Sequence, residues 1–243
     1  MELLPIKIQP DNLKDTLVEF HFQSDTPAEV LPGLVYQSLK DSYKVVARES
    51  RAWQVAPKNF FQVETHDGMQ LTSDFVKIHI RQDSIIFNIA NRYPRWAKFS
   101  ESIFKVLERL FDDGHFKHLT RIGLRYISEY PDMEIFEVMK TKPEVSLPGG
   151  VQQNMTFRSE VNYKGCDIVL SIANKIPSRV NSASELTYFS LVDVIASKLF
   201  NTKPIVNTTT MKEETNLLHQ IQKEFFFGIL KEDYIATLQP EYQ

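Results

Sequence analysis

Apolar and polar residues alternate along several short stretches of the chain, and a period of two is typical of β-strands that bury one face. In residues 17–23, every second residue from Val18 onward is valine or phenylalanine. Residues 71–81 alternate in the same way and are followed by the more apolar stretch 84–90, which together predict a β-hairpin. Further strands are expected at 43–48, 60–63, 119–128, 155–163, 166–174 and 185–195.

Other stretches place apolar residues every three or four positions, which predicts helices with one buried face. Residues 26–29 fit a capping box with proline at the first helical position, ahead of a stripe that ends at Leu39, and Pro32 is an alternative start. Ser100 is expected to cap a second helix, which Gly114 ends. A short helix and a long helix are expected at 133–139 and 213–230.

The order of these elements is β-α-β-β-β-α-β and then β-β-β-α, which predicts an α+β fold with mostly antiparallel sheets and a few packed helices. The turn-rich stretch 142–150 separates an N-terminal α+β half, 1–141, from a C-terminal half, 151–243, and we expect the halves to pack as one unit. Residues 85–94 resemble 168–177. Either a duplication gave two related β-rich halves, or buried strands that run into turns are simply alike.

Composition narrows the class of protein. The 243 residues carry a net charge of −3, which argues against a generally basic nucleic-acid binder. The single cysteine, Cys166, excludes an intrachain disulfide and a four-cysteine zinc site. Without an apolar run of about 18 residues, a signal-peptide pattern or a glycine-rich phosphate loop, we expect a cytoplasmic protein with no membrane contact, no metal and no cofactor.

The strand 121–127 is the most informative stretch for binding chemistry. Its alternation places Arg121, Gly123 and Arg125 on one face and Tyr126 on the other. Two arginines about 13 Å apart along a strand suit an extended anion or the carboxylates of a partner, because a guanidinium is a rigid bidentate donor. The alternative is that they pair with internal carboxylates such as Glu19, and that Gly123 admits a packed aromatic ring.

Asp193 lies in an otherwise apolar strand, between Val192 and Val194. A carboxylate in such a place must be paired, exposed at an edge or functional, because an unpaired buried charge is costly. An ion pair with Arg121 or Arg125 would account for the aspartate and for one of the arginines.

Residues 121–128, Arg-Ile-Gly-Leu-Arg-Tyr-Ile-Ser, resemble the R-x-G-L-R-Y-I-N signature of a sporadically distributed bacterial family of unknown function. Softer similarities lie at 4–6 with 17–20 and at 218–221 with 225–226, so the resemblance covers most of the chain. Ser128 stands where that family usually has asparagine. The resemblance implies no established activity. The patchy distribution of the family is like that of mobile-element, toxin–antitoxin and phage-defence genes.

The loop 92–98 interleaves three basic residues with two aromatic ones. Arg92, Tyr93, Arg95, Trp96 and Lys98 suit stacking and phosphate contact with single-stranded nucleic acid. The same residue types anchor protein interfaces. A third interpretation is that Trp96 holds the following helix against the sheet.

Other polar clusters favour structural roles. His115 and His118 follow Asp112 and Asp113, but their order matches no known metal-ligand spacing, so a solvated helix end is expected. His219 lies near the apolar stripe of the long helix, where a partly buried, hydrogen-bonded histidine is expected. Phe225, Phe226 and Phe227 cannot all face one core, so at least one should meet a second element or subunit.

These patterns favour a non-catalytic protein-binding or regulatory scaffold with a protein partner and a homo-oligomeric state. The alternative is an enzyme or sensor that binds a phosphate-bearing ligand or nucleic acid through Arg121 and Arg125. A nucleic-acid regulator that uses the 92–98 loop is weaker, because the chain is acidic. We expect no catalytic residue, and the candidate binding residues are Arg92, Tyr93, Arg95, Trp96, Arg121, Arg125, Tyr126, Asp193, His219 and Phe226.

Overall fold

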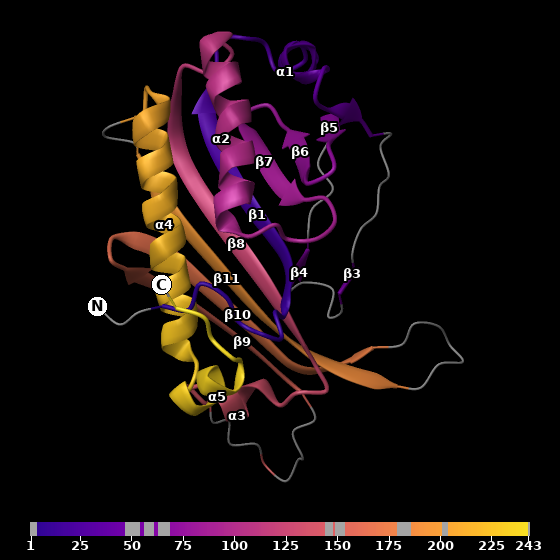
Figure 1. Cartoon of the computed structure of the whole chain (residues 1–243), viewed down its shortest axis with the longest axis vertical. Coiled ribbons are helices and arrows are strands. Elements are labelled where there is room, and N and C mark those ends of the chain that lie inside the picture. The colour runs from indigo at the N-terminus through magenta and orange to yellow at the C-terminus, as the bar shows by residue number, and fades with distance from the viewer. Residues whose placement is uncertain are drawn as a thin grey trace. The chain divides into compact units, whose positions relative to one another are not determined.

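A computed structural model of the chain describes residues 4–46, 54–55, 61–62, 69–143, 148, 154–178, 186–200 and 204–242. Strands form a nine-stranded sheet in the order β2-β5-β6-β7-β1-β8-β11-β10-β9, and β3 pairs with β4 apart from it (Figure 1). Every strand pair with a defined register is antiparallel. The predicted α+β class with mostly antiparallel strands is confirmed. Within the described part of the chain, no helix has the length and apolarity needed to cross a membrane.

The strands are β1 (Leu13–Gln23), β2 (Lys44–Val45), β3 (Gln54–Val55), β4 (Phe61–Gln62), β5 (Met69–Thr72), β6 (Val76–Ile80), β7 (Ser84–Ile89), β8 (His118–Pro131), β9 (Met155–Tyr163), β10 (Cys166–Ser178) and β11 (Thr187–Leu199). The helices are α1 (Leu31–Leu39), α2 (Trp96–Asp112), α3 (Ile135–Val138), α4 (Thr208–Ile229) and α5 (Glu232–Thr237).

The chain forms two compact units that are interleaved along the sequence. Unit 1 comprises Met1–Lys14, Arg125–Ala196 and Leu218–Gln243, and unit 2 comprises Asp15–Leu124 and Ser197–Leu217. The predicted boundary at 142–150 falls mostly outside the described residues. A division into consecutive halves and a duplication therefore stay predictions.

In unit 2, the apolar residues of the alternating strands form the core. Val18, Phe20 and Phe22 of β1 are buried, and β1 pairs with β7. The predicted 71–81 strand is two strands, β5 and β6. The Ser73 hydroxyl bonds the backbone of Val76 and so stabilises the turn between them. The hairpin of β6 and β7 is confirmed.

Two helix starts in unit 2 differ from the prediction. The helix α1 begins at Leu31 with proline in its first turn and Val30 as N-cap, so residues 26–29 form no capping box. The helix α2 begins at Trp96, because Arg95 takes a positive φ of 71° and turns the chain into the helix. Ser100 lies inside α2 and bonds the carbonyl of Ala97 instead of capping. Gly114, with φ 74°, follows the end of α2 as predicted.

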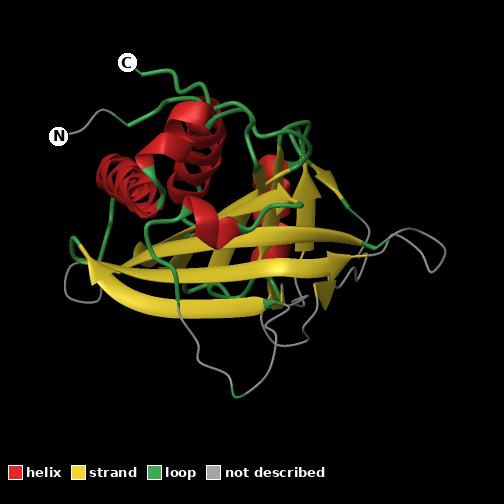
Figure 2. Ribbon diagram, turned by 90° about the horizontal axis from the view of Figure 1, so that it is seen from below, coloured by secondary structure: helices red, strands yellow, loops and turns green. Residues whose placement is uncertain are grey.

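Unit 1 contains β8 from Arg125 onward, most of β11, and β10 and β9, which follow one another in the sheet (Figure 1). Figure 2 shows the long strands lying side by side. The strand β10 does not end at Asn174 as predicted but continues to Ser178. Lys175 within it takes a positive φ of 52°, and its backbone N–H donates to Oγ of Ser190. The chain between β9 and β10 is a two-residue turn at Lys164 and Gly165. Phe225 of α4 packs on Tyr163, so one phenylalanine of the triplet meets a second element as predicted.

Candidate functional site

In unit 2, the Arg121 side chain belongs to a polar cluster formed by β1, β8 and Arg81, the residue that follows β6. Its Nη1 lies 3.3 Å from Oε2 of Glu19 and 3.1 Å from Nε2 of His21. Nη1 of Arg81 approaches the other Glu19 oxygen at 3.6 Å. Burial alone raises the pKa of the Glu19 carboxyl, but the hydrogen bond with His21 and the charges of both arginines outweigh it, and the pKa lies below its ordinary value.

The open space over Gly123 is filled by Arg121 rather than by an aromatic ring. A Cβ at Gly123 would lie 3.7 Å from Nη2 of Arg121 and 3.9 Å from Cβ of Glu19. The predicted aromatic contact is therefore wrong. The guanidinium extends along its own strand over Gly123, where it meets the carboxylate of Glu19.

In unit 1, the predicted ion pair of Asp193 is confirmed, with Arg125 as its partner. Nε and Nη2 of Arg125 donate to the carboxylate at 2.7 to 3.1 Å. The Asp193 side chain is 3% exposed and the Arg125 side chain 19%. Burial raises the pKa of Asp193 above its ordinary value in spite of Arg125. A bidentate pair of this kind holds two strands together and leaves little of the arginine for a ligand.

Tyr126 follows Arg125 and meets α4 through His219. The phenol oxygen of Tyr126 lies 3.1 Å from Nδ1 of His219, and the two rings are 5.7 Å apart. Burial, aided by the charge of Lys223, lowers the pKa of His219 to about 3. At neutral pH the imidazole is uncharged, so the pair is a polar contact within the core, as predicted for this histidine.

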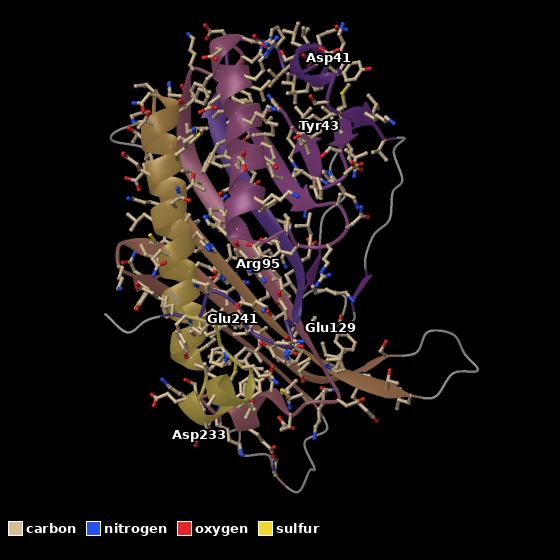
Figure 3. The ribbon with its side chains drawn as sticks, viewed as in Figure 1. Asp41, Tyr43, Arg95, Glu129, Asp233 and Glu241 are labelled. Carbon is tan, nitrogen blue, oxygen red and sulfur yellow. The ribbon has the colours of Figure 1, made fainter. Side chains whose placement is uncertain are left out.

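The surface at the start of α2 differs from these sites because its basic residues have no acidic partner in the described chain. We call Phe75, Arg92, Tyr93, Arg95, Trp96 and Lys98 the basic–aromatic surface. Among the described residues, no carboxylate pairs with Arg92, Arg95 or Lys98, and all three are exposed. The other described arginines all form ion pairs: Arg81, Arg109, Arg121, Arg125 and Arg158. Arg95 marks the N-terminal end of α2 (Figure 3), and the first turn of this helix has no acidic residue.

Contacts with the buried Phe99 and with Asn216 hold the aromatic residues of this surface in place. Tyr93 and Trp96 both stand edge-on to the buried Phe99, with ring centroids 6.0 and 6.5 Å away. The indole Nε1 of Trp96 donates to Oδ1 of Asn216 at 2.9 Å. Lys98 Nζ lies 3.9 Å from the centre of the Phe75 ring. Trp96 thus holds α2 to α4, whereas the prediction placed it against the sheet, and it remains half-exposed.

A hollow of about 510 Å³ lies beside this surface, between α2 and the first part of α4. Its walls carry Glu101, Lys105, Glu108 and Lys212, and the last two form an ion pair. Acidic and basic groups alternate there, so the hollow does not select an anion. The positive charge is concentrated at the basic–aromatic surface.

The remaining candidates have structural contacts. His115 bonds Ser38, and Asp113 pairs with Arg109, while the described residues contain no cluster that could hold a metal ion. Cys166 is buried. Phe226 is half-buried with its ring 5.3 Å from that of Phe227.

Two residues that contribute to the basic–aromatic surface, Asn216 and Phe75, could not be identified from the sequence. Asn216 lies 120 positions from Trp96. Phe75 lies in the turn before β6, where the Asp74 carbonyl accepts a bond from Asn91. These contacts depend on tertiary packing, and no local pattern indicates them.

The sequence matches no protein-family model and no curated protein. The family resemblance carried by residues 121–128 therefore stays a prediction.

Proposed function

We propose that this chain is a non-catalytic binding protein, a regulatory or scaffolding one, that docks an acidic segment of a partner protein on the basic–aromatic surface. One observation carries the proposal. Arg92, Arg95 and Lys98 are exposed without a carboxylate partner in the described chain, whereas every other described arginine is paired.

The chemistry of the surface supports a protein partner. A carboxylate that meets an exposed guanidinium gains a bidentate contact without displacing an internal acid. An exposed apolar group lies beside one of the charges, because Phe75 is 44% exposed and its ring centre lies 3.9 Å from Lys98 Nζ. Tyrosine, tryptophan and arginine together are typical anchors of protein interfaces.

Anion binding elsewhere is less well supported. A phosphate that binds Arg121 or Arg125 must first displace Glu19 or Asp193, and removing one partner of a buried ion pair is costly. At the basic–aromatic surface, Trp96 and Tyr93 are half-exposed and stand against Phe99, which leaves less ring surface for stacked bases. The family resemblance extends the proposal to a mobile-element, toxin–antitoxin or phage-defence setting.

A fluorescence titration tests the proposal. Trp53→Phe leaves Trp96 as the sole tryptophan, so its emission reports on the surface. We expect a glutamate- and aspartate-rich peptide to bind, with an affinity that falls as salt rises. Arg92→Glu with Arg95→Glu should abolish binding. The matched control is Lys40→Glu with Lys44→Glu, which changes the net charge equally at two exposed lysines of unit 2 and should bind normally.

Two outcomes would overturn the proposal. One is a single-stranded oligonucleotide of equal charge that binds more tightly than the peptide and loses its affinity in the Arg92→Glu, Arg95→Glu variant, which would assign the surface to nucleic acid. The other is equal peptide binding by this variant and its lysine control, which would leave only the overall charge as the cause. Capture from the native host with the same two variants then identifies the partner.

A further inference from the structure

The edge strand β9 has a pattern that fits a second copy of the same strand. In the described chain β9 pairs only with β10, and it is the last strand of the sheet. It is nine residues long, whereas β2, the last strand in the other direction, has two. Long unpaired edges invite pairing with another chain, and proteins usually shorten or cover them. The edge of β9 is therefore a candidate interaction surface.

The turn after β9 fixes which backbone groups point outward. Tyr163 and Cys166 flank a two-residue turn in which Lys164 and Gly165 both have positive φ, as in a type I′ hairpin. Flanking residues of such a turn form a hydrogen-bonded pair, and alternate residues then bond toward β10. The peptide groups of Thr156, Arg158, Glu160 and Asn162 consequently point away from β10.

The outward positions are charged in a self-complementary order. Arg158 and Glu160 are 47% and 68% exposed and form an ion pair within the strand at 2.8 Å. If a second copy of β9 pairs antiparallel with the first so that the two Ser159 residues face each other, Arg158 of each copy lies opposite Glu160 of the other. Thr156 then lies opposite Asn162. A copy centred on Arg158 or on Glu160 places like charges opposite each other, which is unfavourable. Among these three registers, only the one centred on Ser159 brings opposite charges together.

On the other face of β9, the apolar residues of the two copies also lie opposite each other in the register centred on Ser159. Phe157 then lies opposite Val161, and Met155 lies opposite Tyr163, each pair occurring twice. These four residues are half-exposed or exposed in the single chain, with Val161 at 40%. Apolar cross-strand pairs add to sheet stability. One register therefore satisfies the outward peptide groups, the charges and the apolar side chains together.

We propose that the protein forms a symmetric homodimer through antiparallel pairing of β9 with β9 of a second copy, centred on Ser159. The partner is a second copy of this chain because the matching positions all lie on the same strand. The proposed interface shares no residue with the basic–aromatic surface, since its residues belong to β9 alone.

Charge exchange tests the pairing. Sedimentation equilibrium of the full chain is expected to show a dimer. In the Arg158→Glu variant, each of the two Glu160 residues lies opposite a glutamate of the other copy. This like-charge contact should raise the dimer dissociation constant at least about tenfold. Glu160→Arg should do the same. The exchanged protein, Arg158→Glu with Glu160→Arg, should recover the dimer, because opposite charges meet again. A circular-dichroism melt confirms that each variant is folded.

A cysteine crosslink tests the register. Ser159 faces itself across the axis as a non-hydrogen-bonded pair, with Cα atoms about 4.5 Å apart, which is within disulfide range. Mild oxidation of Ser159→Cys should give a covalent dimer. Val161→Cys is the matched control, since its two copies would lie about 13 Å apart and should not crosslink. The natural Cys166 is buried.

A monomeric wild-type chain at about 100 µM, well above the dissociation constants of typical specific complexes, would overturn the proposal. So would a dimer that is indifferent to both charge reversals, or one in which Val161→Cys crosslinks as readily as Ser159→Cys. These results leave the proposed acidic partner untouched, because peptide binding is measured at a different surface.

Discussion

The arginines of β8 and the arginines before α2 carry the same charge in different surroundings. Arg121 and Arg125 each lie opposite a carboxylate on a neighbouring element, Glu19 or Asp193. Arg92 and Arg95 lie in a connecting loop and meet no carboxylate in the described chain. An arginine in a sheet interior is tolerated only with a partner, because burial of an unpaired charge is unfavourable. A loop arginine stays hydrated and keeps its charge for a ligand.

The largest effect should come from the most buried pair. Asp193→Ala leaves the Arg125 guanidinium without its carboxylate and should lower the free energy of unfolding by about 3 kcal/mol. Urea denaturation followed by circular dichroism measures the change. Asp167→Ala, at an exposed position of β10, is the control and should stay within about 0.5 kcal/mol. Equal stability of the two variants would mean that the Arg125 pair contributes nothing to folding.

The prediction for Asp193 illustrates what sequence alone can provide. A carboxylate between apolar neighbours in a strand requires a counter-charge, so its ion pair could be expected. Which arginine supplies the charge depends on how β8 and β11 are aligned, and no local pattern encodes this alignment. The prediction of where α2 begins was wrong for a related reason. Ser100 looks like a cap, but the helix begins earlier, at Trp96, after the positive φ of Arg95 and with a tertiary contact from Trp96 to Asn216.

The bounds of β9 were predicted as observed, whereas β1 begins at Leu13, four residues before its predicted start. Prediction failed at the end of β10, which continues beyond Asn174 to Ser178 although Lys175 takes a positive φ and the sequence there resembles the turn after β7. Among the candidate site residues, Arg92 and Arg95 could be identified from the basic and aromatic residues interleaved in the 92–98 loop. Their lack of partners could not, because it depends on which acidic groups the fold brings near.

A second test concerns His219, which contacts the residue after Arg125. Its pKa of about 3 in the folded chain lies below the value of about 6.5 for an unfolded histidine. The unfolded state therefore binds the proton first as pH falls, and stability decreases from about pH 6.5 down to about pH 3. Between pH 7 and 5 the loss should be about 1–2 kcal/mol.

The comparison protein for this measurement is His219→Gln, which retains an acceptor for the Tyr126 hydroxyl and does not titrate. Denaturation at pH 7 and pH 5 should show a smaller loss in this variant. Lys223 also faces His219 and stays unchanged in both proteins. Equal losses of stability in wild type and variant on acidification would mean that burial does not lower the pKa of His219.

A third test converts a paired arginine into an unpaired one. Glu19→Gln removes the carboxylate shared by Arg121 and Arg81 and should cost about 1–2 kcal/mol of stability. Added sulfate should then restore part of the lost melting temperature, because it replaces the missing negative charge. Glu129→Gln, which weakens the exposed contact with Lys14, is the control and should gain nothing from sulfate beyond the wild-type response. A sulfate response no larger than that of the control would contradict the idea that pairing alone separates the two groups of arginines.

The smallest effect on folding should come from the loop arginines. Arg92→Ala with Arg95→Ala removes two exposed side chains that make no ion pair in the described chain, so the free energy of unfolding should change by less than about 0.5 kcal/mol. Binding of the acidic peptide should nevertheless weaken by about tenfold, since two exposed charge contacts are lost. Urea denaturation and the Trp96 titration on the same samples measure both quantities. A variant that loses stability as Asp193→Ala does would show that the loop arginines act in the fold, and the distinction between the two groups would disappear.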